Sequence, residues 1–256
     1  MNHSLVLFSL LCFPLCFGQE YAAKIFEYQK DTLPYRILMP KDYNPKKAYP
    51  LLLVLHGAGE RGNDNESQLF HGGSLFQSAE FRSKYPAVVV FPQCPKDSYW
   101  ANVLRDNRIN LDEKYAYSEI VPENPQLEIV EALIVFLEQQ YRIDSSRRYV
   151  GGLSMGGMGT FELVSRNPDY FAAAFPICGG GNPKWASLLS KTPLWIFHGE
   201  KDDVVSVTYS KQMYEALKKI KAPVKLTLYP EVFHDSWKNA FADSNLMKWL
   251  FSNRKK

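Results

Sequence analysis

The chain has 256 residues, of which 46% are hydrophobic and 22% are charged, with a formal net charge of +3. These proportions are typical of a soluble globular protein and exclude a disordered chain. Apart from a basic cluster at 254–256, the positive charge is spread along the chain. No basic face or stripe is predicted, so nucleic acid is not an expected partner.

The first residues have the pattern of a secretory signal. The apolar run over 5–17 is too short to span a bilayer, and Gly18 is a small residue suited to cleavage. The sequence therefore predicts a signal peptide at 1–18 and one mature domain at 19–256, secreted or periplasmic, with no stable membrane span after cleavage. A buried or membrane-anchoring N-terminal segment is the alternative.

Four cysteines bear on export and on disulfides. Cys12 and Cys16 raise the alternative of a lipoprotein, but each follows a leucine where such signals prefer a small residue. Cys94 and Cys178 would remain after cleavage. An exported protein permits a disulfide, yet bridging depends on a short Cα separation, which the sequence does not give. We expect two free buried thiols.

Apolar runs that alternate with helical patterns predict the fold class. Residues 21–28 and 35–39 alternate and predict antiparallel edge strands. Continuous apolar runs predict strands buried on both faces of a parallel sheet, at 50–55, 87–91, 149–150, 172–177 and 193–197. A last, alternating strand is predicted at 224–229, and helices at 125–141, 158–166, 209–220 and 246–251. This order predicts an α/β fold with a mostly parallel sheet and helices on both faces.

A glycine-rich stretch at 149–159 contains the predicted nucleophile. Gly152 to Gly156 match G-x-S-x-G, the nucleophile elbow, in which Ser154 stands on a tight turn between a strand and a helix. Glycines flank the serine because the turn brings backbone segments too close for a Cβ. The alternative is a glycine-rich loop whose serine has no role.

A serine hydroxyl needs a histidine to take its proton, and the histidine needs a carboxylate to hold its tautomer. In α/β-hydrolases these follow in the order Ser, Asp or Glu, His. His234 follows the last predicted strand and is the expected base. Asp202 is the expected carboxylate, chosen over its neighbours Asp203 and Glu200.

The other four histidines are predicted to have different roles. His3 lies in the signal, and His56 is expected to orient the turn that follows the first buried strand. His198 is expected to support the Asp202 loop, while His71 lies in a loop of uncertain placement. The histidines lack metal-ligand spacing and there is no Cys-x-x-Cys, so no metal and no cofactor are expected.

Acyl transfer also requires donors for the oxyanion of the tetrahedral intermediate. One should be the backbone N–H of Met155, the residue after the nucleophile. The second should come from the glycine-flexible turn after the first buried strand, where Ala58 is chosen and Gly59 is the reserve.

Two connections, 56–85 and 92–123, are longer than the fold needs. Long structureless loops in a compact domain are usually functional or disordered. Both connections leave the sheet edge that carries Ser154. We expect them to form the walls of a substrate cleft, with a surface loop of no function as the alternative.

Five motifs in order resemble exported bacterial carbohydrate esterases within the esterase and depolymerase branch of the α/β-hydrolases, some of which are labelled prolyl-oligopeptidase-like. They are HGAGERG at 56–62, PQCP at 92–95, GLSMGG at 152–157, HGEKD at 198–202 and HDSW at 234–237. The resemblance extends from about Pro34 to the C-terminus. It implies that Asp202, at the fifth position of HG-x-x-D, is the catalytic aspartate. Ser206 departs from the family, in which proline is common, and this should affect loop rigidity more than chemistry.

The resemblance implies a serine esterase that acts on simple esters, such as acetyl or feruloyl esters, some of them linked to plant polysaccharides. It also implies that Gln93, Trp100 and Trp237 line the cleft, since aromatic faces pack against sugars and phenolic acyl groups. A serine peptidase of prolyl-oligopeptidase type ranks lower, because a propeller-sized N-terminal extension is missing. A non-catalytic carbohydrate-binding protein ranks lowest. The oligomeric state does not follow from the sequence.

Overall fold

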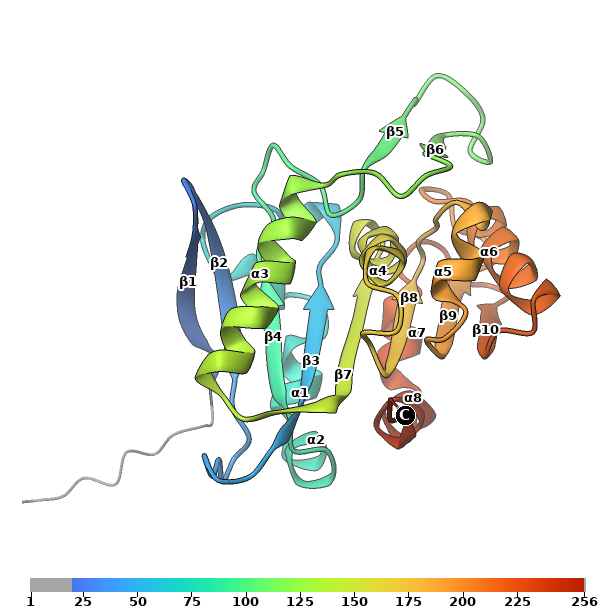
Figure 1. Ribbon diagram of the computed structural model, residues 1–256. Helices are drawn as coiled ribbons and strands as arrows, with labels where there is room; N and C mark the ends of the chain where they lie inside the picture. Colours follow the sequence, from blue (N-terminus) through green and yellow to red (C-terminus); the bar gives the residue numbers. More distant parts are fainter. Residues whose placement is uncertain (1–19, 256) are drawn as a thin grey trace, which may run out of the picture.

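The computed structural model describes residues 20–255, so the predicted signal peptide at 1–18 lies outside the described residues (Figure 1). An eight-stranded sheet forms the centre of the molecule, in the order β1-β2-β4-β3-β7-β8-β9-β10. Its strands are β1 (Ala22–Tyr28), β2 (Asp31–Leu38), β3 (Tyr49–Leu55), β4 (Val88–Pro92), β7 (Ile143–Leu153), β8 (Ala173–Ile177), β9 (Leu194–Gly199) and β10 (Val224–Tyr229). Strand β2 runs antiparallel to both β1 and β4, and the remaining pairs are parallel.

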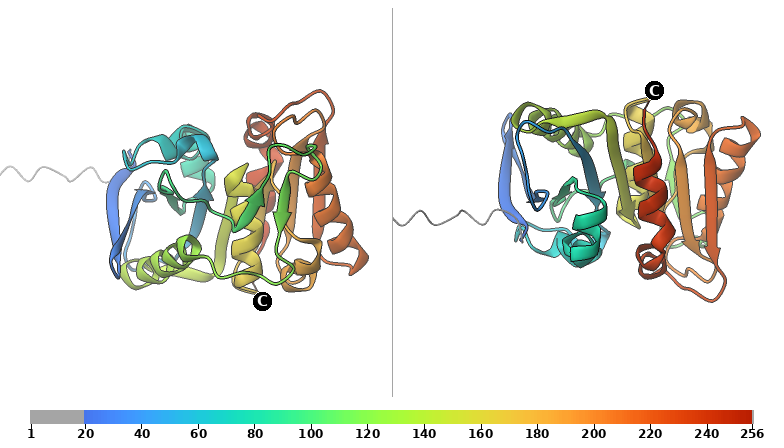
Figure 2. Two further views of the ribbon diagram at one scale, coloured as in Figure 1. Left: turned by 90° about the horizontal axis from the view of Figure 1, so that it is seen from above. Right: turned by 90° about the horizontal axis from the view of Figure 1, so that it is seen from below.

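Helices cover both faces of the sheet, as the views along its edge show (Figure 2). One face carries α3 (Pro125–Gln140), α4 (Met155–Arg166), α5 (Ala186–Leu189) and α6 (Val207–Lys219). The other carries α1 (Gly73–Gln77), α2 (Ala79–Lys84), α7 (Trp237–Ala242) and α8 (Ser244–Ser252). The predicted α/β class is confirmed. Among residues 20–255, no helix combines the length and the apolarity that a bilayer crossing requires.

The apolar runs form the central strands, where helices cover both faces of the sheet. All seven residues of β3 are buried, which contributes roughly 1.5–3 kcal/mol for each large apolar side chain removed from water. Helix α3 begins where the sequence predicts, because the Asn124 side chain accepts hydrogen bonds from the backbone N–H groups of Gln126 and Leu127. Pro125 fills the first helical position, where a missing N–H costs nothing.

The two long connections contain more structure than the sequence suggests. The segment 56–85 includes the 3₁₀ turns η1 (Ala58–Glu60) and η2 (Ser67–Leu69) as well as α1 and α2. The segment 92–123 includes an antiparallel hairpin of β5 (Val103–Arg105) and β6 (Tyr115–Tyr117). This hairpin lies at the edge where the parallel strands end (Figure 1). A further turn, η3 (Pro183–Trp185), precedes α5.

Candidate active site

Ser154 stands between β7 and α4 in a strained backbone conformation, with φ 54° and ψ −116°. Positive φ is uncommon for residues other than glycine and is found at functional turns. The flanking glycines are needed for the close packing of this turn. A Cβ on Gly156 would lie 2.0 Å from the carbonyl oxygen of Leu55, and one on Gly152 would lie 2.5 Å from that of Gly156. Helix α4 therefore begins directly after the serine, three residues earlier than the predicted start at Met158.

The side chains of Ser154, His234 and Asp202 form a continuous hydrogen-bonded chain. His234 Nε2 lies 2.9 Å from Ser154 Oγ, and His234 Nδ1 lies 2.8 Å and 3.0 Å from the two carboxylate oxygens of Asp202. A carboxylate can only accept, so Nδ1 carries the hydrogen and Nε2 is free to accept from the serine hydroxyl. The structure thus brings together the three residues that the motif order selects.

Asp202 is fixed from three sides. The backbone N–H groups of Val204 and Val205 each donate to Oδ1 at 2.9 Å, and His198 Nε2 lies 3.0 Å from Oδ2. Burial alone would raise the pKa of the Asp202 carboxyl, but the hydrogen bonds from His198 and His234 outweigh it and lower that pKa below its usual range. Asp202 is therefore an anion at neutral pH. The predicted supporting role of His198 is confirmed.

The two alternative carboxylates lie elsewhere. Asp203 and Glu200 are exposed, and Glu200 is 3.9 Å from Lys211. Neighbouring residues of the loop point in different directions, so only one of the adjacent aspartates reaches the histidine.

His56 holds the turn that contains the expected oxyanion donor Ala58. Its Nε2 accepts a hydrogen bond from the backbone N–H of Cys94 at 2.9 Å, and its Nδ1 lies 2.6 Å from the carbonyl oxygen of Gly57. The prediction that His56 orients this turn is confirmed. A Cβ on Gly57 would lie 3.7 Å from Ser154 Cβ, so the turn lies directly beside the serine. Ala58 begins η1 and Met155 begins α4.

The burial of His56 gives the fold a measurable pH dependence. Burial lowers the pKa of His56 to about 4, against 6.5 for an unperturbed histidine. As the pH falls from 6.5 toward 4, His56 becomes protonated in the unfolded chain but stays neutral in the folded chain. Protonation therefore favours the unfolded chain, and stability is lost over this range. We expect His56 to account for a decrease of about 2 kcal/mol in the free energy of unfolding between pH 7 and pH 5.

Urea denaturation at several pH values checks this expectation. The glutamine in the variant His56→Gln cannot titrate. The free energy of unfolding of this variant should therefore fall less steeply between pH 7 and pH 5, even if the variant is less stable at every pH. His71, whose pKa burial also lowers, still contributes to the slope of both proteins. Equal slopes for the wild type and the variant would contradict the assignment to His56.

Two of the three expected cleft residues lie beneath the site instead. Gln93 and Trp100 are fully buried. The Gln93 side chain accepts from the backbone N–H of Asn65 and donates to Asp64, and the Trp100 ring packs against His56 at 5.2 Å. The structure therefore does not place them on a cleft wall, because hydrogen bonds and packing hold both side chains against the connection 56–85.

The third expected cleft residue, Trp237, is partly exposed and stands edge-on to His234, with ring centroids 5.5 Å apart. Its other neighbour is His71, at 4.8 Å. His71 Nε2 in turn lies 3.6 Å from a carboxylate oxygen of Glu60. The sequence patterns assign no role to Glu60 or to His71, although Glu60 lies within the HGAGERG motif.

The connection 92–123 is fastened to α4 by a buried carboxylate. Glu162 accepts hydrogen bonds from the backbone N–H of Asn102 at 2.8 Å and from the side-chain amide of Asn124 at 2.7 Å. Burial raises the pKa of Glu162. At the other end of the hairpin, Asp112 accepts hydrogen bonds from Ser206 and Thr208 at the start of α6. Ser206, the departure from the family, thus links this connection to the Asp202 loop.

Cys94 and Cys178 are free and buried, as expected. Ligand atoms of Cys178, Asp202 and His234 lie within 4.8 Å of one another. The His234 and Asp202 atoms are already paired with Ser154 and with each other. Burial raises the pKa of the Cys178 thiol, which disfavours the thiolate that a metal would need. We assign this cluster to the Ser154 site.

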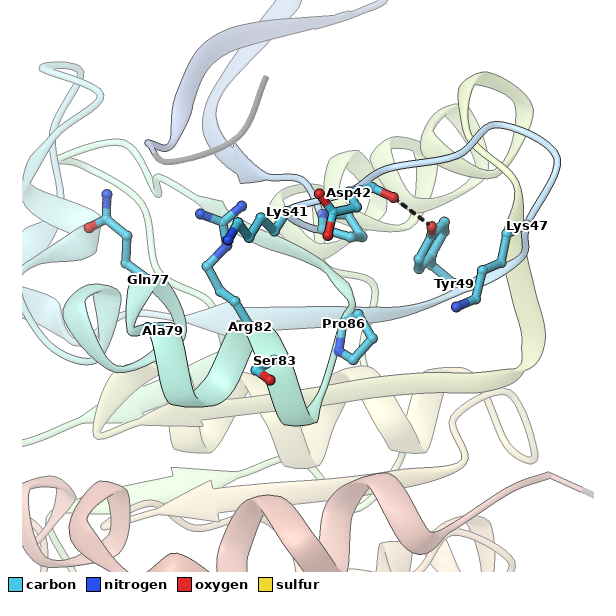
Figure 3. Close-up of a pocket in the computed structure, with 10 residues that line it drawn as sticks. Lys41, Asp42, Lys47, Tyr49, Gln77, Ala79, Arg82, Ser83 and Pro86 are labelled. Atoms are coloured by element: carbon cyan, nitrogen blue, oxygen red, sulfur yellow. Dashed lines mark hydrogen bonds between the residues drawn. The ribbon is translucent and has the colours of Figure 1, made fainter. Parts of the chain in front are cut away.

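A separate cavity of about 740 Å³ lies at the opposite edge of the sheet (Figure 3). Its walls come from the segment before β3 and from α2, and include Lys41, Lys47 and Arg82. The parallel strands begin at this edge, whereas Ser154 follows the end of β7. The cavity is therefore distinct from the Ser154 site.

Comparison with known proteins gives the family. Residues 28–222 match the model of the family described as "Putative esterase". The chain belongs to this esterase family. A solved structure described as a thermostable esterase superposes with a TM-score of 0.83 at 34% identity, covering 92% of this chain and 64% of that one. The chain thus has the α/β-hydrolase fold, as expected.

The aligned part of the chain covers less than half of each of two curated relatives. A bifunctional acetylxylan esterase/xylanase of Neocallimastix patriciarum is 29% identical over 169 residues, which is 61% of this chain and 20% of that protein. A probable feruloyl esterase C of Aspergillus oryzae is 26% identical over 148 residues, 57% of this chain and 46% of the relative. The chain therefore matches only a fifth to about half of the length of these relatives.

Proposed function

We propose that the protein is a serine carboxylic-ester hydrolase that works through an acyl-enzyme. The observation that carries this proposal is the position of His234, which lies within hydrogen-bond distance of both Ser154 Oγ and the buried Asp202 carboxylate. A serine so placed can lose its proton as it attacks a carbonyl carbon.

The proposed reaction has two halves. His234 Nε2 takes the Ser154 proton while Oγ bonds to the carbonyl carbon, and the backbone N–H groups of Ala58 and Met155 stabilise the oxyanion. His234 then gives the proton to the departing alcohol oxygen, which leaves an ester between the acyl group and Ser154. In the second half, His234 takes a proton from water while the water oxygen attacks the acyl carbon. His234 then returns the proton to Ser154 Oγ, and the carboxylic acid leaves. Asp202 stabilises the imidazolium in both halves.

Simple or carbohydrate-linked esters, such as acetyl or feruloyl esters, are the substrates that we propose. The relatives include proteins described as acetylxylan and feruloyl esterases, and the partly exposed Trp237 ring beside His234 can pack against a sugar or a phenolic ring. We further infer that the mature enzyme is a single domain over 19–256, exported by the apolar segment at 5–17.

A fluorophosphonate tests the proposal directly. Ser154 Oγ should displace fluoride from phosphorus and form a stable covalent adduct, with one label per chain and Ser154 as the modified residue in peptide mass spectrometry. Saturating p-nitrophenyl acetate should slow labelling, since both molecules compete for one hydroxyl. A chain that remains unlabelled, or is labelled at another residue, would refute the proposed nucleophile.

A further inference from the structure

Two polar atoms near Ser154 have no hydrogen-bond partner in the part of the chain that the structure describes. They are Glu60 Oε2 and Trp237 Nε1, and both are buried. Buried polar groups are nearly always paired, and a carboxylate oxygen is among the costliest to leave without a donor. An unpaired carboxylate oxygen inside a site therefore indicates a donor that arrives with a ligand.

Glu60 Oε2 lies next to the nucleophile. Glu60 is the last residue of η1, the turn that Ala58 begins. The position that a Cβ on Gly57 would occupy is 3.0 Å from Glu60 Oε2 and 3.7 Å from Ser154 Cβ. The carboxylate oxygen and the serine are thus both close neighbours of Gly57, in the expected oxyanion turn.

The rest of the Glu60 side chain is held in place. Oε1 lies 3.6 Å from His71 Nε2, and the exposed fractions of the two side chains are 13% and 22%. The His71 ring packs against Trp237, and Trp237 stands against His234. Glu60 is therefore linked to the reacting groups through His71 and Trp237, with Oε1 near His71 and Oε2 buried without a partner.

We propose that Glu60 determines alcohol specificity, with Oε2 accepting a hydrogen bond from a sugar hydroxyl on the carbon next to the esterified one; this rests on the proposed function. A carboxylate only accepts, so its ligand must bring a donor. A neighbouring sugar hydroxyl lies close to the reacting carbonyl, as Glu60 lies close to Ser154. The phenolic hydroxyl of a feruloyl group is a ring and a vinyl group away from the carbonyl, too far for this position.

The variants Glu60→Gln and Glu60→Ala test the proposal on three esters. Acetylated xylobiose has hydroxyls beside the ester, methyl ferulate has only the distant phenol, and p-nitrophenyl acetate has none. For acetylated xylobiose we expect Glu60→Ala to raise KM roughly 10- to 100-fold, and Glu60→Gln to raise it less, since an amide oxygen still accepts. KM for the other two esters should rise far less than KM for acetylated xylobiose, because neither presents a hydroxyl at this position.

Glu66→Gln is the matched control, because Glu66 is a largely exposed carboxylate in the same connection. It should leave all three esters unchanged. An equal loss on all three esters in the Glu60 variants would overturn the proposal and make Glu60 a structural residue of η1. An unchanged KM for acetylated xylobiose would overturn it too.

A failure of the proposed function would have a different signature. In that case the wild type would hydrolyse none of the three esters. Calorimetric titration of wild type and Glu60→Ala with xylobiose would then decide the subsite on its own: weaker binding by the variant supports it, and equal affinity overturns it.

Discussion

Ser154→Ala is expected to lower kcat/KM for p-nitrophenyl acetate by roughly 10⁴- to 10⁶-fold, because no other group in the proposed mechanism can form the acyl-enzyme. The fold should survive. Asp202 keeps its hydrogen bond to His234, and among residues 20–255 the removed hydroxyl bonds to His234 alone. The residual rate should come from the oxyanion donors and from substrate binding alone.

Steady-state kinetics and thermal unfolding together check this result. Ser187→Ala is a suitable control, since Ser187 is an exposed serine on α5. It should match the wild type in both measurements. A Ser154→Ala protein that unfolds at the wild-type temperature and keeps a tenth of the wild-type rate would rule out Ser154 as the nucleophile.

Asp202→Asn should have the second largest effect, a decrease of roughly 10³- to 10⁴-fold in kcat. The carboxylate selects the His234 tautomer with hydrogen on Nδ1 and stabilises the imidazolium that forms during attack. An asparagine amide has no negative charge and can present a donor to Nδ1, which would leave Nε2 protonated and unable to accept the serine proton.

Asp203→Asn provides a control at the adjacent position, because Asp203 is exposed and does not contact His234. Its kcat should equal that of the wild type within about 2-fold. Comparable losses in the two variants would mean that loop charge, rather than a contact with His234, supports activity. The measurement is kcat with p-nitrophenyl acetate at neutral pH.

The strands could be predicted from the sequence because their apolar composition indicates that they are buried. A parallel strand covered on both faces needs apolar residues at every position, and β3 and β4 have them. The candidate site could be predicted because its residues follow strand ends in a fixed chain order. Strand ends meet at one edge of a parallel sheet, so Ser154, Asp202 and His234 could be selected without knowing their distances.

The connections could not be predicted in the same way. Their short helices and their hairpin are fixed by contacts with distant residues, such as the hydrogen bond from the Tyr115 backbone to the Tyr209 hydroxyl. Local sequence patterns do not indicate which distant residues a loop will contact. The family resemblance implies a cleft position for Trp100, but an aromatic residue suits a sugar-binding surface and a core equally well, so the sequence does not separate the two. The unpaired oxygen of Glu60 also becomes visible only once its neighbours are placed.

The attachment of Asn102 and Asn124 to a single Glu162 carboxylate has a consequence for how this protein can change. Because both residues bind the same carboxylate, the segment between them begins and ends at nearly the same point. This segment is therefore an insert whose two ends are held together at Glu162. The entropy of closing such a loop grows only slowly with its length. The insert can therefore be lengthened, shortened or exchanged, as long as its two anchors, Glu162 and the contacts of Asp112 and Tyr115 with α6 are kept. New substrate preferences could then evolve, or be engineered, in a part of the chain that does not determine where the nucleophile stands.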